Sequence, residues 1–327
     1  MEMRKIIGIL LCLVLCLTPI ETKAKVATTG VDENGNTWVY DKTTKTLTFS
    51  GDGNISDFEM DGHSDEPKWY KWSDETEHIV IEDGIKGIGS DAFCDFVNVK
   101  SITMSDSVTR INNSAFSWCV ELKTVRLSNN LKMIGNDVFA GCNSLKVLKL
   151  PNTLSKMGKL GGCPKLLNIQ IPDSVKNVPK GVFEECYNLK NIVLPQNLKT
   201  IESNSFWGCK KLNKLVMPNS LKNVYMSAFQ GCGLKKIILP QNVDVIRRGT
   251  AKKIRVFGTN NGANYPTKNL RVIEIRSKKL KSIQKNSFSG LSSKVTIKVP
   301  KSKKKKYIKM LRKSGLSKKV KIKTLTA

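Results

Sequence analysis

The chain has 327 residues, 40% of them hydrophobic, which is enough for a sizeable core and excludes disorder throughout. Lysine and arginine number 55 against 27 aspartate and glutamate residues, which gives a formal net charge of +28. The only two histidines, His63 and His78, leave little room for histidine-based catalysis or a histidine metal site. We therefore expect a strongly basic protein without cofactor or metal.

The first 24 residues have the pattern of a secretory signal peptide. Arg4 and Lys5 precede an unbroken apolar run from Ile6 to Leu17, and a polar stretch then ends at the small residue Ala24. The apolar run is shorter than the roughly 20 residues that span a bilayer, which disfavours the alternative of an N-terminal membrane anchor. We predict cleavage after Ala24 and a mature protein without a transmembrane segment, secreted or held non-covalently at the cell surface.

Residues 25–78 are expected to form a β-rich, acidic N-terminal cap. The runs 37–40 and 46–49 alternate in polarity around a turn at 41–45, as the strands of a hairpin do. Trp69, Tyr70 and Trp72 follow and are suited to covering one end of a core. Residues 26–83 contain 14 acidic and 4 basic side chains, a net charge of −10.

From residue 79 to residue 300 the chain repeats a unit of about 23 residues, which reads L-x-x-I-x-L-P-x-x-L-x-x-I-x(4)-F-x-x-C. The L-x-x-I-x-L part alternates with period two and predicts a short strand, and proline ends it because it cannot donate to a β ladder. The phenylalanine–cysteine pairs are Phe116/Cys119, Phe139/Cys142, Phe183/Cys186, Phe206/Cys209 and Phe229/Cys232, with Leu160/Cys163 in a copy shortened to 21 residues.

One such unit cannot bury its own apolar residues, but stacked units share a continuous core, so the repeat predicts a solenoid. The register breaks near residues 247–268, where Asn260-Asn261-Gly262 indicates an inserted loop, and it returns at Leu270.

The repeat resembles that of the BspA-type leucine-rich-repeat proteins. The A-F-x-x-C motif, as in Ala228 to Cys232, and the strand followed by proline are the marks of that family. The resemblance covers about residues 79–300. It implies a right-handed leucine-rich-repeat solenoid with short parallel strands on the concave face, and it implies exported, surface-associated proteins, some of which are adhesins.

The cysteines of the repeat are expected to be buried free thiols, because one small apolar side chain per coil at the same position suits the core of a solenoid. They form no C-x-x-C pair that would indicate a metal site. Cys94 lies outside this column, and we expect it to be the more exposed thiol. A catalytic cysteine would need a histidine nearby, and both histidines lie in the N-terminal segment, so we predict no enzymatic activity.

Residues on either side of the second apolar position of each strand should point outward, away from the core. Two columns run down the coils in this way, and the first becomes apolar over its last three members. Exposed contiguous apolar surface often marks a partner site, although β-branched residues also simply favour strands. The candidate ligand-binding residues are Arg126, Lys149, Gln170, Val193, Val216 and Ile238 from one column and Lys214 and Lys236 from the other.

Residues 301–327 are expected to form a basic C-terminal cap, with a helix over 302–312 that ends at Gly315 and a final strand over 320–325. Residues 241–327 contain 2 acidic and 26 basic side chains, a net charge of +24. Such a region can bind a polyanion, associate with the acidic end of another copy, or simply keep the protein soluble. The candidate polyanion-binding residues are Lys303, Lys304, Lys305, Lys306, Lys309, Arg312 and Lys313.

These features together predict a secreted or cell-surface, non-enzymatic binding protein that recognises a protein or glycan through the concave face of the repeats. The alternative is an envelope protein held on anionic cell-wall polymers by its basic C-terminal part. The export signal argues against genomic nucleic acid as the partner.

Overall fold

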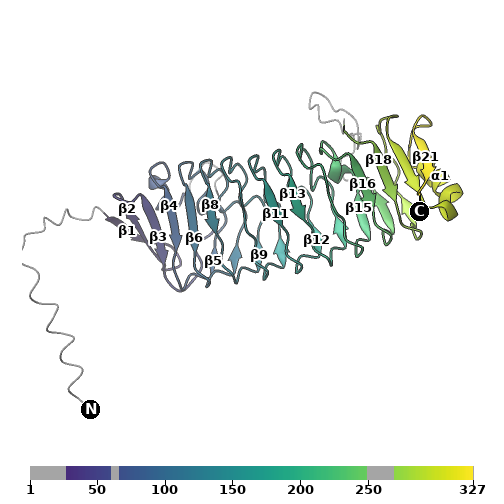
Figure 1. Ribbon diagram of the computed structural model, residues 1–327. Helices are drawn as coiled ribbons and strands as arrows, with labels where there is room; N and C mark the ends of the chain where they lie inside the picture. Colours follow the sequence, from purple (N-terminus) through teal and green to yellow (C-terminus); the bar gives the residue numbers. More distant parts are fainter. Residues whose placement is uncertain (1–26, 60–65, 249–268, 327) are drawn as a thin grey trace, which may run out of the picture.

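The computed structural model describes residues 27–59, 66–248 and 269–326 (Figure 1). The chain winds into an elongated solenoid whose coils stack side by side from β1 at one end to β21 and α1 at the other (Figure 1). Most coils contribute one strand to each of two faces, and the strands within a face pair in parallel along the repeats. This architecture confirms the solenoid of short parallel strands predicted from the repeat.

The first face holds the strands of the L-x-x-I-x-L segments together with those of the two ends. It consists of a six-stranded, a two-stranded and a four-stranded sheet. Its strands are β1 (Ala27–Val31), β2 (Thr37–Asp41), β3 (Thr46–Ser50), β4 (His78–Ile81), β6 (Ser101–Met104), β8 (Thr124–Arg126), β11 (Asn168–Gln170), β13 (Asn191–Val193), β16 (Lys236–Leu239), β18 (Val272–Ile275), β20 (Thr296–Val299) and β21 (Lys321–Thr324).

The second face holds the shorter strands that follow the proline of each repeat, in a four-stranded and a five-stranded sheet. Its strands are β5 (Gly87–Ile88), β7 (Arg110–Ile111), β9 (Met133–Ile134), β10 (Lys156–Met157), β12 (Asn177–Val178), β14 (Thr200–Ile201), β15 (Asn223–Tyr225), β17 (Val245–Arg247) and β19 (Ser282–Ile283). The 3-10 turn η2 (Met226–Phe229) follows β15 directly.

The repeated phenylalanines stack through the middle of the solenoid. Phe116 and Phe139 are fully buried with ring centroids 6.0 Å apart, and Phe206 lies 6.0 Å from Phe183 with nearly parallel rings. Leu160 is also buried, and it takes the place of a ring in the shortened copy. Because each coil contacts only its neighbours, this column of side chains forms one continuous core.

The turns around the phenylalanines need a left-handed backbone, which explains the recurrent glycine, asparagine and aspartate there. Two residues before the ring, φ is +56° at Asp137 and +60° at Asn204. Two residues after the ring, φ is +75° at Gly208 and +72° at Gly231. These two positions let each coil turn sharply on both sides of its buried phenylalanine.

The repeated cysteines are free and buried, as predicted. Each thiol contacts a backbone carbonyl of the preceding coil; the Cys209 thiol donates to Phe183 O at 3.2 Å and the Cys232 thiol to Phe206 O at 2.9 Å. Burial raises the pKa of Cys186 to about 12, so that thiol stays protonated and unreactive. The column therefore has a structural role, linking each coil to the one before it.

Cys94 is the most exposed of the described cysteines, as expected, but it is 7% exposed and so belongs to the core. Its side chain is buried, and its sulfur lies 3.0 Å from the Ser117 hydroxyl of the next coil. Burial raises the pKa of Cys94 to about 11. The Ser117 hydroxyl thus gives the buried Cys94 sulfur a polar partner in the adjacent coil.

At the N-terminal end, β1, β2 and β3 form an antiparallel unit, and β3 pairs in parallel with β4, so the cap continues the first face. Trp69 is fully buried over the first coil and donates from its indole nitrogen to Ala92 O at 2.9 Å. The 3-10 turn η1 (Tyr70–Trp72) follows it.

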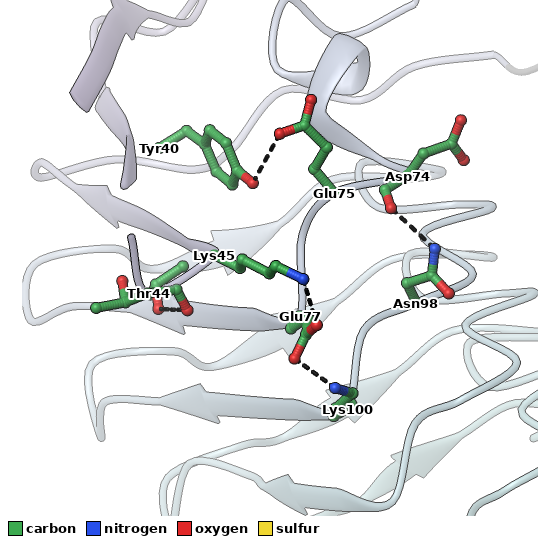
Figure 2. A network of polar contacts seen from close by, with 9 residues as sticks. Tyr40, Thr44, Lys45, Asp74, Glu75, Glu77, Asn98 and Lys100 are labelled. Atoms are coloured by element: carbon green, nitrogen blue, oxygen red, sulfur yellow. Dashed lines mark hydrogen bonds and ion pairs between the residues drawn. The ribbon is translucent and has the colours of Figure 1, made fainter. Parts of the chain in front are cut away.

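Polar contacts join this cap to the first repeats (Figure 2). The Tyr40 hydroxyl donates to Glu75 at 3.4 Å, and the Glu77 carboxylate bridges Lys45, at 2.8 Å, and Lys100. Hydrogen bonds from Lys100 and Lys45 hold the pKa of Glu77 at about 2, well below its usual value. Glu77 is therefore ionised in the folded protein at neutral pH and bonded to a lysine on each side.

At the C-terminal end, the 3-10 turn η3 (Lys301–Lys303) leads into α1 (Lys304–Lys313), which matches the predicted helix to within two residues. Tyr307 and Leu311 are buried, and the Tyr307 hydroxyl donates to Ser277 O at 2.9 Å and accepts from Leu280 N at 3.1 Å. Gly315 follows the helix with φ +88°, and β21 then pairs with β20.

Two predictions concern residues outside the described ranges: the signal peptide at 1–24, and residues 249–268 of the inserted loop. The division of the chain into cap, repeats and cap at residues 25–78, 79–300 and 301–327 stays a prediction. Among the described residues, no helix has the length and apolar character to cross a membrane.

Candidate binding hollows on the first face

The predicted ligand-binding residues lie on the first face, and seven of the eight line two separate hollows. The first, which we call the Val216 hollow, has a volume of about 360 Å³. Val216 is 70% exposed there and Ile238 is half-buried. Lys214 and Lys236 of the predicted set also line it, together with Arg276, and Leu215, Met217 and Pro240 supply its apolar wall.

The second, the Val193 hollow, has a volume of about 570 Å³ and lies nearer the N-terminus. Lys149, Gln170 and Val193 line it, and Val193 is 54% exposed. Arg126, at the end of β8, is exposed but does not line either hollow. The predicted single ridge of Val193, Val216 and Ile238 is thus divided, with Val193 in one hollow and the other two in the next.

The hollows coincide with gaps in the β ladder of the first face. Residues 213–217 form no strand between β13 and β16, and residues 147–150 make only the isolated bridge from Val147 to Asn168. In both places the segment keeps its apolar alternation without the strand pairing of its neighbours, and a depression opens beside it.

A buried carboxylate organises the charges beside the Val216 hollow. Glu274 on β18 is paired in register with Ile238 and is 5% exposed. Its carboxylate lies 2.7 Å from Lys236 Nζ and 3.0 Å from Arg276 Nη2, and 4.0 Å from Lys298 Nζ. Burial alone would raise the pKa of Glu274, but the hydrogen bonds from Lys236 and Arg276 outweigh it and lower the pKa.

The resulting surface is apolar at its centre and basic at its rim. Lys236 and Arg276 remain about half exposed although both bond Glu274, and Lys214 and Lys235 are exposed. One carboxylate therefore stands among four cations around the hollow. This arrangement suits a ligand that presents an apolar group beside an acidic one.

The sequence reasoning missed Glu274 and Arg276. The signal was available, because the I-x-I pair at 273–275 aligns with the I-x-L pair at 237–239, and Glu274 then falls in the same outward column as Ile238. Glu274 is also one of only two acidic residues after residue 240.

The predicted polyanion-binding residues lie on and around α1. Lys304, Lys305, Lys306, Lys309 and Lys313 are exposed, whereas Lys303 and Arg312 are half-buried. The Arg312 guanidinium donates to the carbonyls of Leu316, at 3.4 Å, Ser317 and Val320, at 3.0 Å. Arg312 therefore holds the turn between α1 and β21, while the exposed lysines can meet an external anion.

The model of the BspA type leucine rich repeat region matches this sequence in six copies, over residues 66–177, 159–253 and 259–326. The chain belongs to this family. BspA-type proteins are typically extracellular or on the cell surface, and they typically bind or scaffold rather than catalyse. Among functionally curated proteins, none matches the chain.

Solved structures of bacterial leucine-rich-repeat proteins are similar to this BspA-type chain. A leucine-rich repeat protein from Bacteroides ovatus is 24% identical over 91% of this chain and 75% of that one, with a TM-score of 0.61, and shares the fold. The T. pallidum protein TpLRR is 25% identical over 59% and 91%, with a TM-score of 0.44. The pneumococcal vaccine antigen PcpA is 18% identical over 93% and 100%, with a TM-score of 0.43.

Proposed function

We propose that this BspA-type protein is a secreted or surface-held, non-enzymatic, adhesin-like protein that binds a protein or glycan partner through the first face. The Val216 hollow is the observation that carries the proposal. It combines the exposed apolar side chain of Val216 with a basic rim at a gap in the β ladder. Exposed apolar surface of this kind, rimmed by polar groups, is typical of interaction sites.

The chemistry of the hollow favours a partner with an aliphatic or aromatic group next to a carboxylate. Val216 and Ile238 can bury the apolar part, while Lys214 and Arg276 can pair with the acid. Because Glu274 already neutralises part of the charge on Lys236 and Arg276, the hollow keeps a net positive charge without an unpaired buried cation.

The test is a binding panel with the mature protein against host matrix proteins, acidic and neutral glycans and purified wall polymers, at increasing salt. Val216→Ser is compared with Val31→Ser, which removes an exposed valine on β1 of the same face that lines neither hollow. We expect one protein or glycan to bind at high salt and Val216→Ser alone to weaken it. Equal binding by both variants would remove the Val216 hollow from the proposal.

A second candidate function is retention on anionic wall polymers by α1. The support is that Lys304, Lys305, Lys306 and Lys309 are exposed on a cap at the end of the solenoid, and no ion pair is found for them among the described residues. Binding of this kind should weaken steeply with salt, whereas contacts centred on Val216 should weaken less. Replacing the four lysines with glutamine should abolish retention, and unchanged retention would exclude this role for α1.

A further inference from the structure

A column of basic side chains runs along the solenoid beside the first face. It occupies the residue immediately before the first-face segment in six of the eight coils between Lys100 and Arg271, and every member is exposed. We call it the cation column; its members are Lys100, Lys123, Lys146, Lys190, Lys235 and Arg271.

Backbone hydrogen bonds between coils fix the spacing of this column. Lys123 N donates to Lys100 O at 2.9 Å, and Lys190 N donates to Leu167 O, also at 2.9 Å. Leu167 N in turn donates to Lys146 O at 3.0 Å. Successive positions are therefore separated by one strand spacing, about 4.8 Å, along a nearly straight line.

Two coils break the column, with Leu167 and Asn213 at its position, and Lys165 of the first of these coils lies beside the break at Leu167. Lys165 lines a hollow of about 310 Å³ together with Lys123, Lys146, Ser144 and Glu121. Three lysines thus surround one depression that holds a single carboxylate. Lys190 follows, and beyond the break at Asn213 the column resumes at Lys235, which lines the Val216 hollow.

The lysines in the middle of the column have no anionic partner within the described part of the chain. Ion pairs are found for Lys100, which bonds Glu77, but not for Lys123, Lys146, Lys165 or Lys190. Like charges stacked one coil apart repel each other and are destabilising unless a counterion lies along them. Glu77 closes the N-terminal end, so the open stretch begins at Lys123.

We propose that the cation column binds an extended, carboxylated polysaccharide that lies parallel to the solenoid axis. An extended polyuronate carries one carboxylate per sugar ring and so presents its charges at nearly the interval of one coil. Duplex DNA fits poorly, because its phosphates wind around an axis and recur about every 3.4 Å along each strand. A linear poly(glycerol phosphate) has a longer, more flexible repeat and is the competing polyanion.

The chain offers a matched control on the other face. Lys132, Lys176, Lys199 and Lys222 precede strands of the second face in the same periodic way and are exposed. Ser155 and Asp244 interrupt that column, and the hollow beside it is lined by Met157, Val175 and Pro179 as well as by lysine. Removing four charges there changes the net charge of the protein equally.

The experiment measures binding of a fluorescent oligogalacturonate to the full-length mature protein by anisotropy at several salt concentrations. One variant carries Lys123→Gln, Lys146→Gln, Lys165→Gln and Lys190→Gln. A second carries the four substitutions on the second face, and a third changes Lys304, Lys305, Lys306 and Lys309 to glutamine. Circular dichroism melting checks that all three are folded.

We expect the first variant to bind at least about tenfold more weakly and to lose about 3 from the slope of log K against log salt, because four charge contacts are removed. The other two variants should bind like the wild type. Equal losses in all three variants would show that only net charge matters and would overturn the proposal. Tighter binding of poly(glycerol phosphate) or DNA than of the oligogalacturonate would overturn the choice of ligand. The Val216→Ser variant distinguishes this site from the proposed function. It should weaken binding in the Val216 hollow but leave binding of the oligogalacturonate unchanged, because the cation column is intact.

Discussion

Replacing Glu274 with glutamine should destabilise the C-terminal coils and strengthen the binding of acidic ligands in the Val216 hollow. The Glu274 side chain is 7% exposed and accepts hydrogen bonds from Lys236 and Arg276. Glutamine keeps the shape and one acceptor oxygen but removes the charge. The two cations then lose their shared counterion, and the rim of the hollow gains one net positive charge.

The loss in the free energy of unfolding depends on how exposed Glu274, Lys236 and Arg276 are. A hydrogen bond to a charged group contributes about 1.5–3 kcal/mol, so losing both in full would be severe. Lys236 and Arg276, however, are 44% and 53% exposed and can regain water in the variant. We therefore expect a loss of about 1–3 kcal/mol in the free energy of unfolding.

The same contact predicts a pH dependence. The folded protein holds the pKa of Glu274 below its usual value of 4.5, so the carboxylate contributes stability at pH above 4.5. That contribution falls as the pH drops through the lower, folded-state pKa, where the wild type also becomes protonated. The difference between the wild type and Glu274→Gln should consequently be largest near pH 7 and shrink below pH 4.5.

Urea unfolding at neutral and acidic pH measures both effects. The control is Glu33→Gln, which breaks an exposed ion pair with Lys68 and should change stability by at most about 1 kcal/mol. If Glu274→Gln were no more destabilising than Glu33→Gln, or if its effect did not depend on pH, the account of Glu274 as an organising charge would be refuted.

Three further substitutions test the core and the C-terminal cap. Phe206→Ala should cost about 3–5 kcal/mol in urea unfolding, because it opens a cavity in the stacked core, and Phe206→Leu should cost less, since the shortened coil already accommodates Leu160. Cys209→Ser should lower stability by about 1–3 kcal/mol in thermal melts followed by circular dichroism, as it buries a more polar group in an apolar site, and an unchanged melt would contradict this. Arg312→Ala should cost about 1.5–3 kcal/mol and speed hydrogen exchange in β21, whereas Lys313→Ala should do neither.

The regular parts of the fold could be read from the sequence because each of their signals recurs. The alternation around Ile192 and the proline after Leu194 predict a strand and its end, and 23 residues earlier the same pattern around Ile169 predicts the strand with which it pairs. Cys94 shows the limit of that reasoning. It lies one residue after Phe93, outside the cysteine column, and its buried sulfur contacts a hydroxyl of the next coil. No periodic position predicts such a pairwise contact.

Both hollows lie beside coils of irregular length, which the sequence shows. Residues 147–150 lie within the copy shortened to 21 residues, and Leu234 comes one residue early in the coil that follows residues 213–217. Gly233 permits that early entry, because a side chain there would collide with the Lys210 carbonyl oxygen. The change of length itself does not shift the strands, because Val147 still bridges its equivalent Asn168 and β16 pairs in full with β18 across the inserted loop. We infer that the segments without strand pairing, rather than the repeat length, mark where the face is hollowed, and that the residues pointing outward beside them are the ones to test first.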